Sequence, residues 1–149
     1  MTLAAGSRLT AARLNRLQPK TYMAACTSAL TATTSTYADI TGASITLNTE
    51  VANATYVAHA VFDMNVLAVS GSILMVGRMQ VDAVTDSGIA VYAMDALTRA
   101  TVAMTWRGTL ASAGSHTFKL QGALTSSLAT GGAFQQDDTK LQVTIYEVV

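Results

Sequence analysis

Hydrophobic and polar residues alternate with a period of two along most of this chain. The clearest run covers residues 55–69, where every second residue is apolar. The residues on its apolar face are Tyr56, Ala58, Ala60, Phe62, Met64, Val66 and Ala68. This alternation predicts a β-strand with one face in the core, because successive side chains of a strand point to opposite sides of the sheet.

Seven further segments have the features of short strands. They are residues 23–31, 43–49, 73–82, 89–95, 101–110, 116–124 and 140–148. Gly and Ser residues separate most of them, and the Ser/Thr/Ala/Gly-rich residues 124–133 are typical of a flexible loop. About eight strands joined by turns, with no helix between them, predict an all-β antiparallel sandwich over residues 21–149.

Residues 7–18 carry the only helical pattern. Thr10 suits the N-cap position, and Leu9 and Leu14 have the spacing of a hydrophobic staple around it. Pro19 ends the helix, because proline disfavours helical angles in the residue before it. We therefore predict a short helix within an N-terminal arm, residues 1–20. So short a helix is unstable alone, so its leucines must pack on the body or on a partner.

The arm also differs from the rest of the chain in charge. Its charged residues are all basic, namely Arg8, Arg13, Arg16 and Lys20. The remaining residues hold the other five basic side chains and all nine acidic ones. A basic arm on a mildly acidic body predicts docking to an acidic partner. The alternative is a helix face that is simply exposed to water.

The outward faces of two predicted strands carry little charge. The outward residues are Thr101, Ala103, Thr105 and Thr109 in one strand and Gln142, Thr144, Tyr146 and Val148 in the other. Small uncharged surfaces cost little to desolvate, so these faces suit burial against another subunit. A low-charge surface that stays in water is the alternative interpretation.

Composition excludes several functional classes. Half of the 149 residues are hydrophobic and only 12% are charged, about half the usual share. This balance argues against disorder, and no apolar run is long enough for a membrane span. The formal net charge is zero, so no overall field favours nucleic acid. No basic segment precedes an apolar stretch at the start, so we expect no signal peptide and assembly in the cytoplasm.

The residue types needed for catalysis or metal binding are sparse. The chain has two histidines, His59 and His116, and one cysteine, Cys26, which we expect to be a buried, inert thiol. His59 lies on the polar side of its strand, where it either titrates at a subunit boundary or is a plain surface residue. We expect His116 to be a turn residue, and the pair Asp137-Asp138 to be a solvated turn rather than a calcium site. We predict no enzyme, cofactor or metal.

Four segments carry a resemblance to known proteins. They are TTSTYADITG at 33–42 leading into ASITL at 43–47, GTLASAGSHTFKLQ at 108–121, LQVTIYEVV at 141–149, and LAAGSRLTAARLN at 3–15. The first three resemble the small jelly-roll domains of bacteriophage virion proteins, which are similar in fold to trimeric TNF-like heads. The last resembles attachment arms in structural proteins of phages that infect actinobacteria, and the Ala/Thr-rich composition agrees with a GC-rich genome.

The resemblance implies a jelly-roll protein on the virion surface, assembled in the host cytoplasm as a homotrimer with Tyr146 near its axis. It implies a capsid decoration (minor capsid) protein that contacts the major capsid protein through its arm. The attachment residues would be Arg8, Leu9, Arg13, Leu14, Arg16, Leu17 and Lys20. One alternative is a minor tail or tail-tip receptor-binding protein, with a host surface glycan as a possible ligand. The other is a free carbohydrate-binding module, which would normally expose several aromatic residues.

Overall fold

A computed structural model describes residues 10–147 of the chain. Apart from helix α1 (Ala11–Leu17), this part consists of strands and the turns that join them. The strands are β1 (Lys20–Ala25), β2 (Leu30–Ala32), β3 (Ala38–Thr49), β4 (Ala54–Val66), β5 (Ser70–Val81), β6 (Val84–Thr85), β7 (Ala90–Met94), β8 (Arg99–Leu110), β9 (Gly114–Leu124), β10 (Gly132–Phe134) and β11 (Lys140–Tyr146). In residues 10–147, no helix has the length and apolar character needed to cross a membrane.

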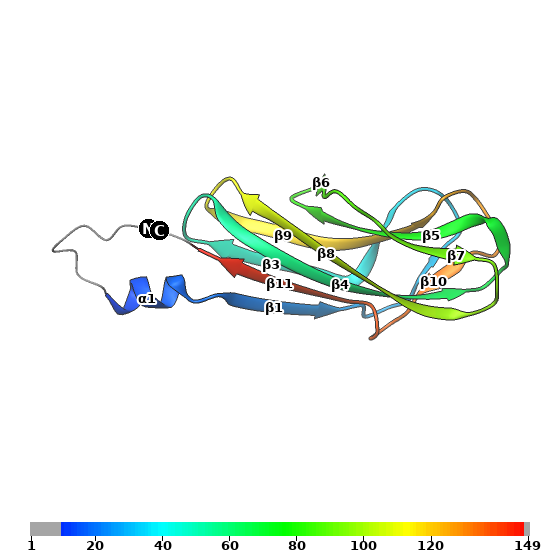
Figure 1. The fold of residues 1–149 in the computed structure, drawn as a ribbon, viewed down its shortest axis with the longest axis horizontal. Coiled ribbons are helices and arrows are strands. Elements are labelled where there is room, and N and C mark those ends of the chain that lie inside the picture. Colours follow the sequence, from blue (N-terminus) through cyan, green and yellow to red (C-terminus); the bar gives the residue numbers. More distant parts are fainter. Residues whose placement is uncertain (1–9, 148–149) are drawn as a thin grey trace.

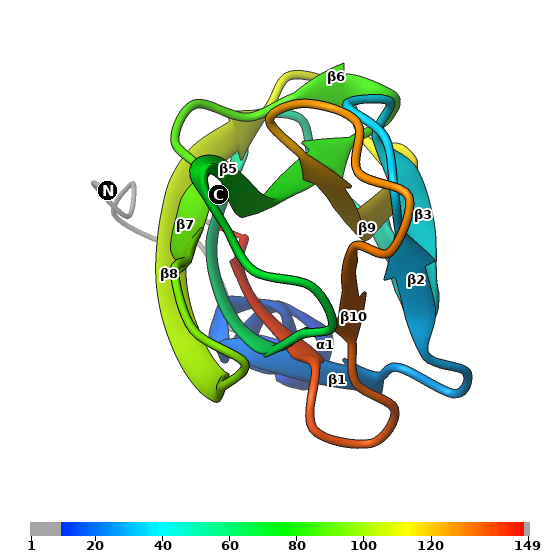
Figure 2. The same ribbon diagram turned by 90° about the vertical axis from the view of Figure 1, so that its right-hand side faces the viewer.

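The strands form two antiparallel sheets that pack face to face (Figures 1 and 2). In sheet A, β4 pairs with β8 along one side and with β11 and β10 along the other. The outer neighbour of β11 is β1, and that of β10 is β2. In sheet B, β9 lies between β3 and β5, whose far side pairs with β6 and β7. The predicted all-β antiparallel sandwich is therefore confirmed.

The predicted strand at residues 23–31 is wrong, because the chain turns in its middle. β1 ends at Ala25, where the backbone N–H of Cys26 donates to the carbonyl of Thr139 at 2.8 Å. The next residue, Thr27, donates to the carbonyl of Thr41 at 2.8 Å, and the chain resumes as β2. Part of the expected flexible loop is also ordered, since Gly132–Phe134 forms the buried strand β10.

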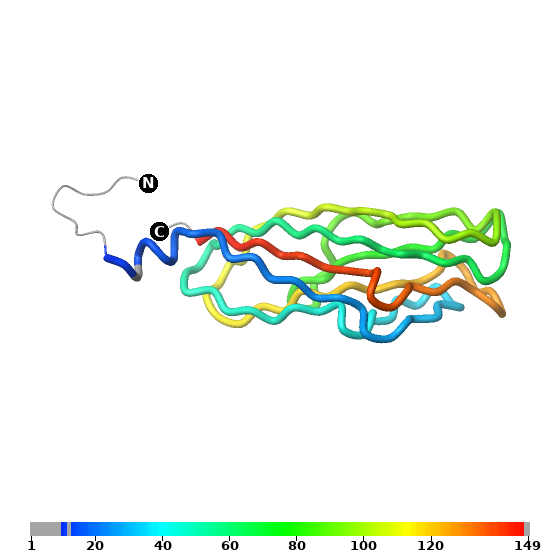
Figure 3. The backbone as a smooth tube through the Cα atoms, turned by 90° about the horizontal axis from the view of Figure 1, so that it is seen from below, coloured from blue at the N-terminus to red at the C-terminus, as the bar shows by residue number. Residues whose placement is uncertain are grey.

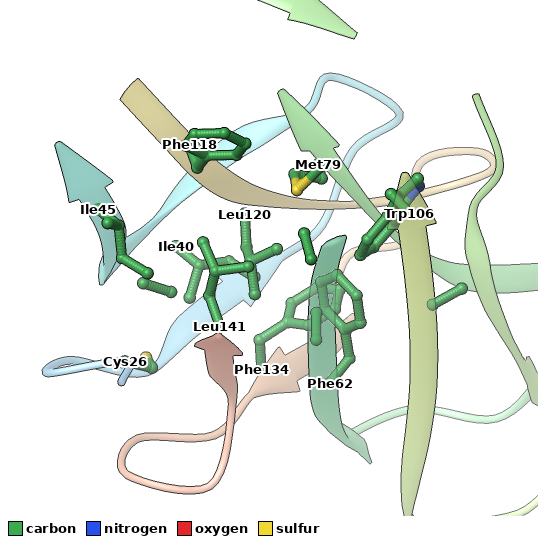
Figure 4. Packing of buried hydrophobic residues seen from close by; sticks show 14 of the residues in the cluster. Cys26, Ile40, Ile45, Phe62, Met79, Trp106, Phe118, Leu120, Phe134 and Leu141 are labelled. Atoms are coloured by element: carbon green, nitrogen blue, oxygen red, sulfur yellow. The ribbon is translucent and has the colours of Figure 1, made fainter. Parts of the chain in front are cut away.

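The core fills the space between the sheets and is rich in aromatic residues (Figure 4). The ring of Phe62 packs edge-on against Trp106 and Phe134, with ring centres 6.4 Å and 6.1 Å apart. Gly122 makes room for this cluster, because an added Cβ would lie 2.3 Å from the Phe134 ring. Cys26 is buried, as expected, and Trp106 is buried as well.

Candidate functional site

The arm helix leaves the sandwich at the end where β1 begins and β11 finishes (Figures 1 and 3). Thr10 is its N-cap, and the Thr10 hydroxyl accepts the backbone N–H of Arg13 at 3.3 Å. The helix finishes at Leu17, before Pro19, as predicted. Leu14 is 48% exposed and Leu17 is 36% exposed. The described arm thus presents two leucines that the rest of this chain covers only in part.

Two of the predicted attachment cations have partners within the chain. The Lys20 ammonium lies 2.9 Å from a carboxylate oxygen of Glu147, whose side chain is only 2% exposed. The Arg16 guanidinium lies 3.8 Å from the Glu50 carboxylate. These contacts fasten the base of the arm to the sandwich. They leave Leu14, Leu17 and Arg13 on the helix as the described residues best placed for an external partner.

The Glu147 carboxylate is held ionised by its surroundings. Burial raises the pKa of Glu147, but the hydrogen bonds from Lys20 and from the backbone N–H of Glu50 outweigh burial and lower it overall. The same hydrogen bond from Lys20 to Glu147 raises the pKa of Lys20. The pair therefore stays charged around neutral pH, where it joins the start of β1 to the end of β11.

The second candidate surface is the outer side of sheet A near the arm, which we call the neutral face. Cross-strand register places its residues in four rows across β1, β11, β4 and β8. The rows are Tyr146-Thr55-Thr109, Thr21-Thr144-Val57-Arg107, Met23-Gln142-His59-Thr105 and Ala25-Lys140-Val61-Ala103. Only Arg107 and Lys140 are charged, and both lie towards the margins. Tyr146 is 39% exposed in the row nearest the arm.

The third candidate site is a cavity of about 360 Å³ between the two sheets, which we call the inter-turn cavity. It lies where the β5–β6 turn faces the β8–β9 turn. Its residues come from three distant parts of the chain and are Tyr56, Val81, Asp82, Val84, Thr85, Asp86, Thr109, Leu110, Ala111, Ser112 and His116. The Tyr56 hydroxyl donates to the Asp86 carboxylate at 2.6 Å, which joins β4 to the β6–β7 loop.

His116 occupies one wall of the inter-turn cavity and is not the turn residue expected from the sequence. It lies in β9 and is 4% exposed. Its Nδ1 is 2.6 Å from the Asp82 carboxylate and its Nε2 is 3.0 Å from the Ser112 carbonyl. Burial raises the pKa of Asp82. The hydrogen bonds from His116 and from the backbone N–H of Thr117 together outweigh burial and lower this pKa overall. His116 thus joins the two turns that border the cavity.

The structure brings some predicted site residues together and leaves others apart. Arg13, Leu14, Arg16, Leu17 and Lys20 follow one another along the arm, while Tyr146 lies on the neutral face at the same end. Arg8 and Leu9 lie outside the described residues. The inter-turn cavity was missed, because its residues come from separate segments and no single segment carries a signal for it. In residues 10–147, no group of three His, Cys, Asp or Glu side chains is arranged to hold a metal ion.

Comparison with known proteins shows that the sandwich shares its jelly-roll fold with several solved structures. No family model matches the sequence, and no curated protein does. The similar solved structures include viral capsid chains, and their identities are so low that they show the fold alone.

Three of these structures illustrate the range. A chain from the structure of the infectious bursal disease virus Gx strain matches 89% of this chain at a TM-score of 0.52 and 9% identity. A chain of T=1 particles derived from infectious bursal virus matches 87% of this chain at a TM-score of 0.53 and 14% identity. Murine APRIL matches 87% of this chain at a TM-score of 0.51 and 4% identity. The chain spans 37% and 32% of the viral chains and the whole of the APRIL chain.

Proposed function

We propose that this chain is a bacteriophage virion structural protein, a trimeric decoration protein held on the capsid shell by its N-terminal arm. The observation that carries the proposal is the arm helix, which leaves one end of the sandwich with Leu14 and Leu17 exposed. Chains of viral particles share the fold, which supports a structural role. The resemblance of residues 3–15 to phage attachment arms supports an actinobacterial host.

Arm energetics favour attachment by several arms at once. Leu14 is 48% exposed and Leu17 is 36% exposed, so burying the parts still in contact with water contributes roughly 1–3 kcal/mol in total. Ordering the arm costs about 1 kcal/mol or more for each residue that becomes fixed, which offsets much of this gain. Charge-assisted hydrogen bonds from Arg13 to an acidic shell surface would add to the affinity. Three arms on one trimer would add more, because the second and third arms bind intramolecularly.

The neutral face supports the homotrimer. Interfaces are depleted of charge at their centres, and the middle rows of this face hold threonine, valine, glutamine, methionine and histidine, with Arg107 at the β8 end of one row. A closed ring of three subunits would cover this face without producing an open filament. Tyr146, in the row nearest the arm, is the residue we propose to lie near the axis.

The test removes the arm without disturbing the body. A variant that lacks residues 2–18 keeps Lys20 and therefore the partner of the buried Glu147 carboxylate. We expect it to remain a folded trimer and to lose co-sedimentation with particles assembled without this protein. Normal decoration by this variant would show that the sandwich itself docks. Binding at a few copies per particle would assign the protein to the tail.

Matched point variants separate arm contacts from general surface hydrophobicity. The variant Leu14→Ser/Leu17→Ser should lose most particle binding. Its control is Leu67→Ser/Leu97→Ser, which changes two exposed apolar residues in the β4–β5 and β7–β8 turns, at the opposite end from the arm (Figure 1). The control should bind as the unmodified chain does. Equal loss in both variants would contradict a specific role for the arm.

A further inference from the structure

The inter-turn cavity combines an apolar interior with a polar rim. Tyr56 and Leu110 are buried, and Val81 packs against the core beside them. The carboxylate of Asp82 is about half exposed at the rim, opposite the exposed Thr109 and Ser112 on the other turn. A volume of about 360 Å³ falls within the usual range for small-ligand sites.

The hydrogen bonds around the cavity leave acceptors free. The Asp86 carboxylate accepts from the Tyr56 hydroxyl at 2.6 Å and from the backbone N–H of Ser87 at 2.7 Å. The Asp82 carboxylate accepts from the backbone N–H of Thr117 at 2.8 Å and faces His116 at 2.6 Å. Each carboxylate oxygen has more than one acceptor site, so both groups can accept further hydrogen bonds.

The charge of the cavity is negative on its exposed side. The pKa of Asp82 is lowered, so this carboxylate is ionised at neutral pH. Burial, followed by the hydrogen bond to Asp86, raises the pKa of Tyr56, so the phenol keeps its proton and donates. The lining contains no lysine or arginine, and its one histidine, His116, lies 2.6 Å from the Asp82 carboxylate. A ligand that donates several hydrogen bonds and carries positive charge is the complement of this lining.

We infer that the inter-turn cavity binds an alkylguanidinium or alkylammonium group, the chemistry of a basic side chain on a protein partner. The cationic head would bond to Asp82 and Asp86, and its methylene stem would lie against Val84 and Leu110. A neutral sugar fits less well, because Tyr56 is buried and offers no open ring face for stacking. The inference concerns a different part of the chain from the arm and does not depend on the trimer.

The test uses the full chain, labelled with ¹⁵N, and small probes. n-Butylguanidinium should shift the amide signals of Thr85, Asp86 and Ala111 with a dissociation constant in roughly the millimolar range, as expected for so small a ligand. n-Butylurea has nearly the same shape without the charge and should bind at least about tenfold more weakly. Equal shifts by the two probes, or saturation of the same signals by a neutral methyl glycoside alone, would overturn the inference.

Variants locate the interaction. Asp86→Asn retains an acceptor for Tyr56 and should weaken n-butylguanidinium binding about tenfold or more. The control Asp95→Asn removes an exposed carboxylate in the β7–β8 turn and should leave the affinity unchanged. If Asp86→Asn does not fold, the comparison of the two probes on the unmodified chain decides the question alone. An unchanged affinity in folded Asp86→Asn would exclude the site.

Discussion

The outer surfaces of the two sheets are built on the same alternation but carry different chemistry. On sheet B, Asp39 accepts hydrogen bonds from Lys119 at 2.8 Å and from Gln121 at 2.6 Å. Gln121 in turn accepts from Arg78 at 2.8 Å, and the Arg78 guanidinium lies 3.8 Å above the Tyr37 ring. Charged and amide groups therefore form one connected network across β3, β9 and β5.

The neutral face of sheet A has no such network. Its cross-strand contacts are made by uncharged side chains, as between Thr21 and Thr144 at 3.0 Å and between His59 and Thr105 at 3.0 Å. Arg107 and Lys140 are the charged residues of this face, and the bonded charges Arg99, Asp63 and Asp138 lie beyond it. This difference is what we expect if sheet B faces water and if the neutral face meets a second subunit, as we propose.

The largest effect is expected from placing the same charge on the outer surface of each sheet. Thr144 and Thr46 occupy equivalent settings, since each hydroxyl lies 3.0 Å from a threonine hydroxyl on the neighbouring strand. Thr144→Glu should convert the trimer to monomers at micromolar concentration, because an unpaired carboxylate buried between subunits costs several kcal/mol. Thr46→Glu should leave the trimer intact. Sedimentation velocity measures the oligomeric state of both variants. If both remain trimers, the neutral face is not the subunit interface.

A smaller effect is expected from removing one ammonium group on each sheet. Lys20→Met leaves the buried Glu147 carboxylate without its cation and should lower the free energy of unfolding by about 2 kcal/mol. Lys119→Met breaks a more exposed pair with Asp39 and should cost less than about 1 kcal/mol. Urea unfolding of both variants gives the difference. Equal losses would mean that burial of Glu147 contributes little.

The smallest effect is a difference in acid sensitivity. The pKa of Glu147 is lower in the folded chain than its ordinary value of 4.5, so the folded state binds fewer protons than the unfolded state. The resulting stabilisation is complete above about pH 4.5 and is lost as the pH falls through the lowered pKa. Glu147→Gln should therefore flatten the decline of stability in acid, as measured by urea unfolding between pH 5 and about pH 2.5.

The matched variant on sheet B is Asp39→Asn. The hydrogen bond from Lys119, followed by that from Gln121, lowers the pKa of Asp39, which gives the same sign of pH dependence. Because the Asp39 side chain is more than half exposed, water and salt screen it. Asp39→Asn should flatten the acid decline less than Glu147→Gln. The reverse order would contradict the view that burial sets the size of these effects.

Local patterns in the sequence predicted the strands well, because alternation is a property of neighbouring residues. The inward residues of β4, from Tyr56 to Val66, are all buried as expected. Features set by distant partners could not be predicted in this way. The strand expected at 23–31 is interrupted because Cys26 bonds to Thr139, and His116 is buried because Asp82 meets it across a turn.

The candidate sites show the same division between local and distant information. Leu14 and Leu17 have helical spacing, so their common placement on the arm followed from the sequence. The partner of Lys20 could not be predicted in this way, because Glu147 lies 127 positions further along the chain. The inter-turn cavity joins β4, the β5–β6 turn and the β8–β9 turn, and no single segment carries a signal for it.

The position of β11 in sheet A has a consequence for how the chain reaches its fold. β11 lies between β1 and β4, so β1 gains its sheet partner only when β11, more than 100 residues later, has been made. Until then the newly made chain leaves an edge of β4 and both edges of β1 open to pairing with other chains. Pairings so distant in sequence are slow to form. Synthesis of many copies at once would therefore favour aggregation of this chain over folding, and chaperones that bind unfinished chains would raise its yield.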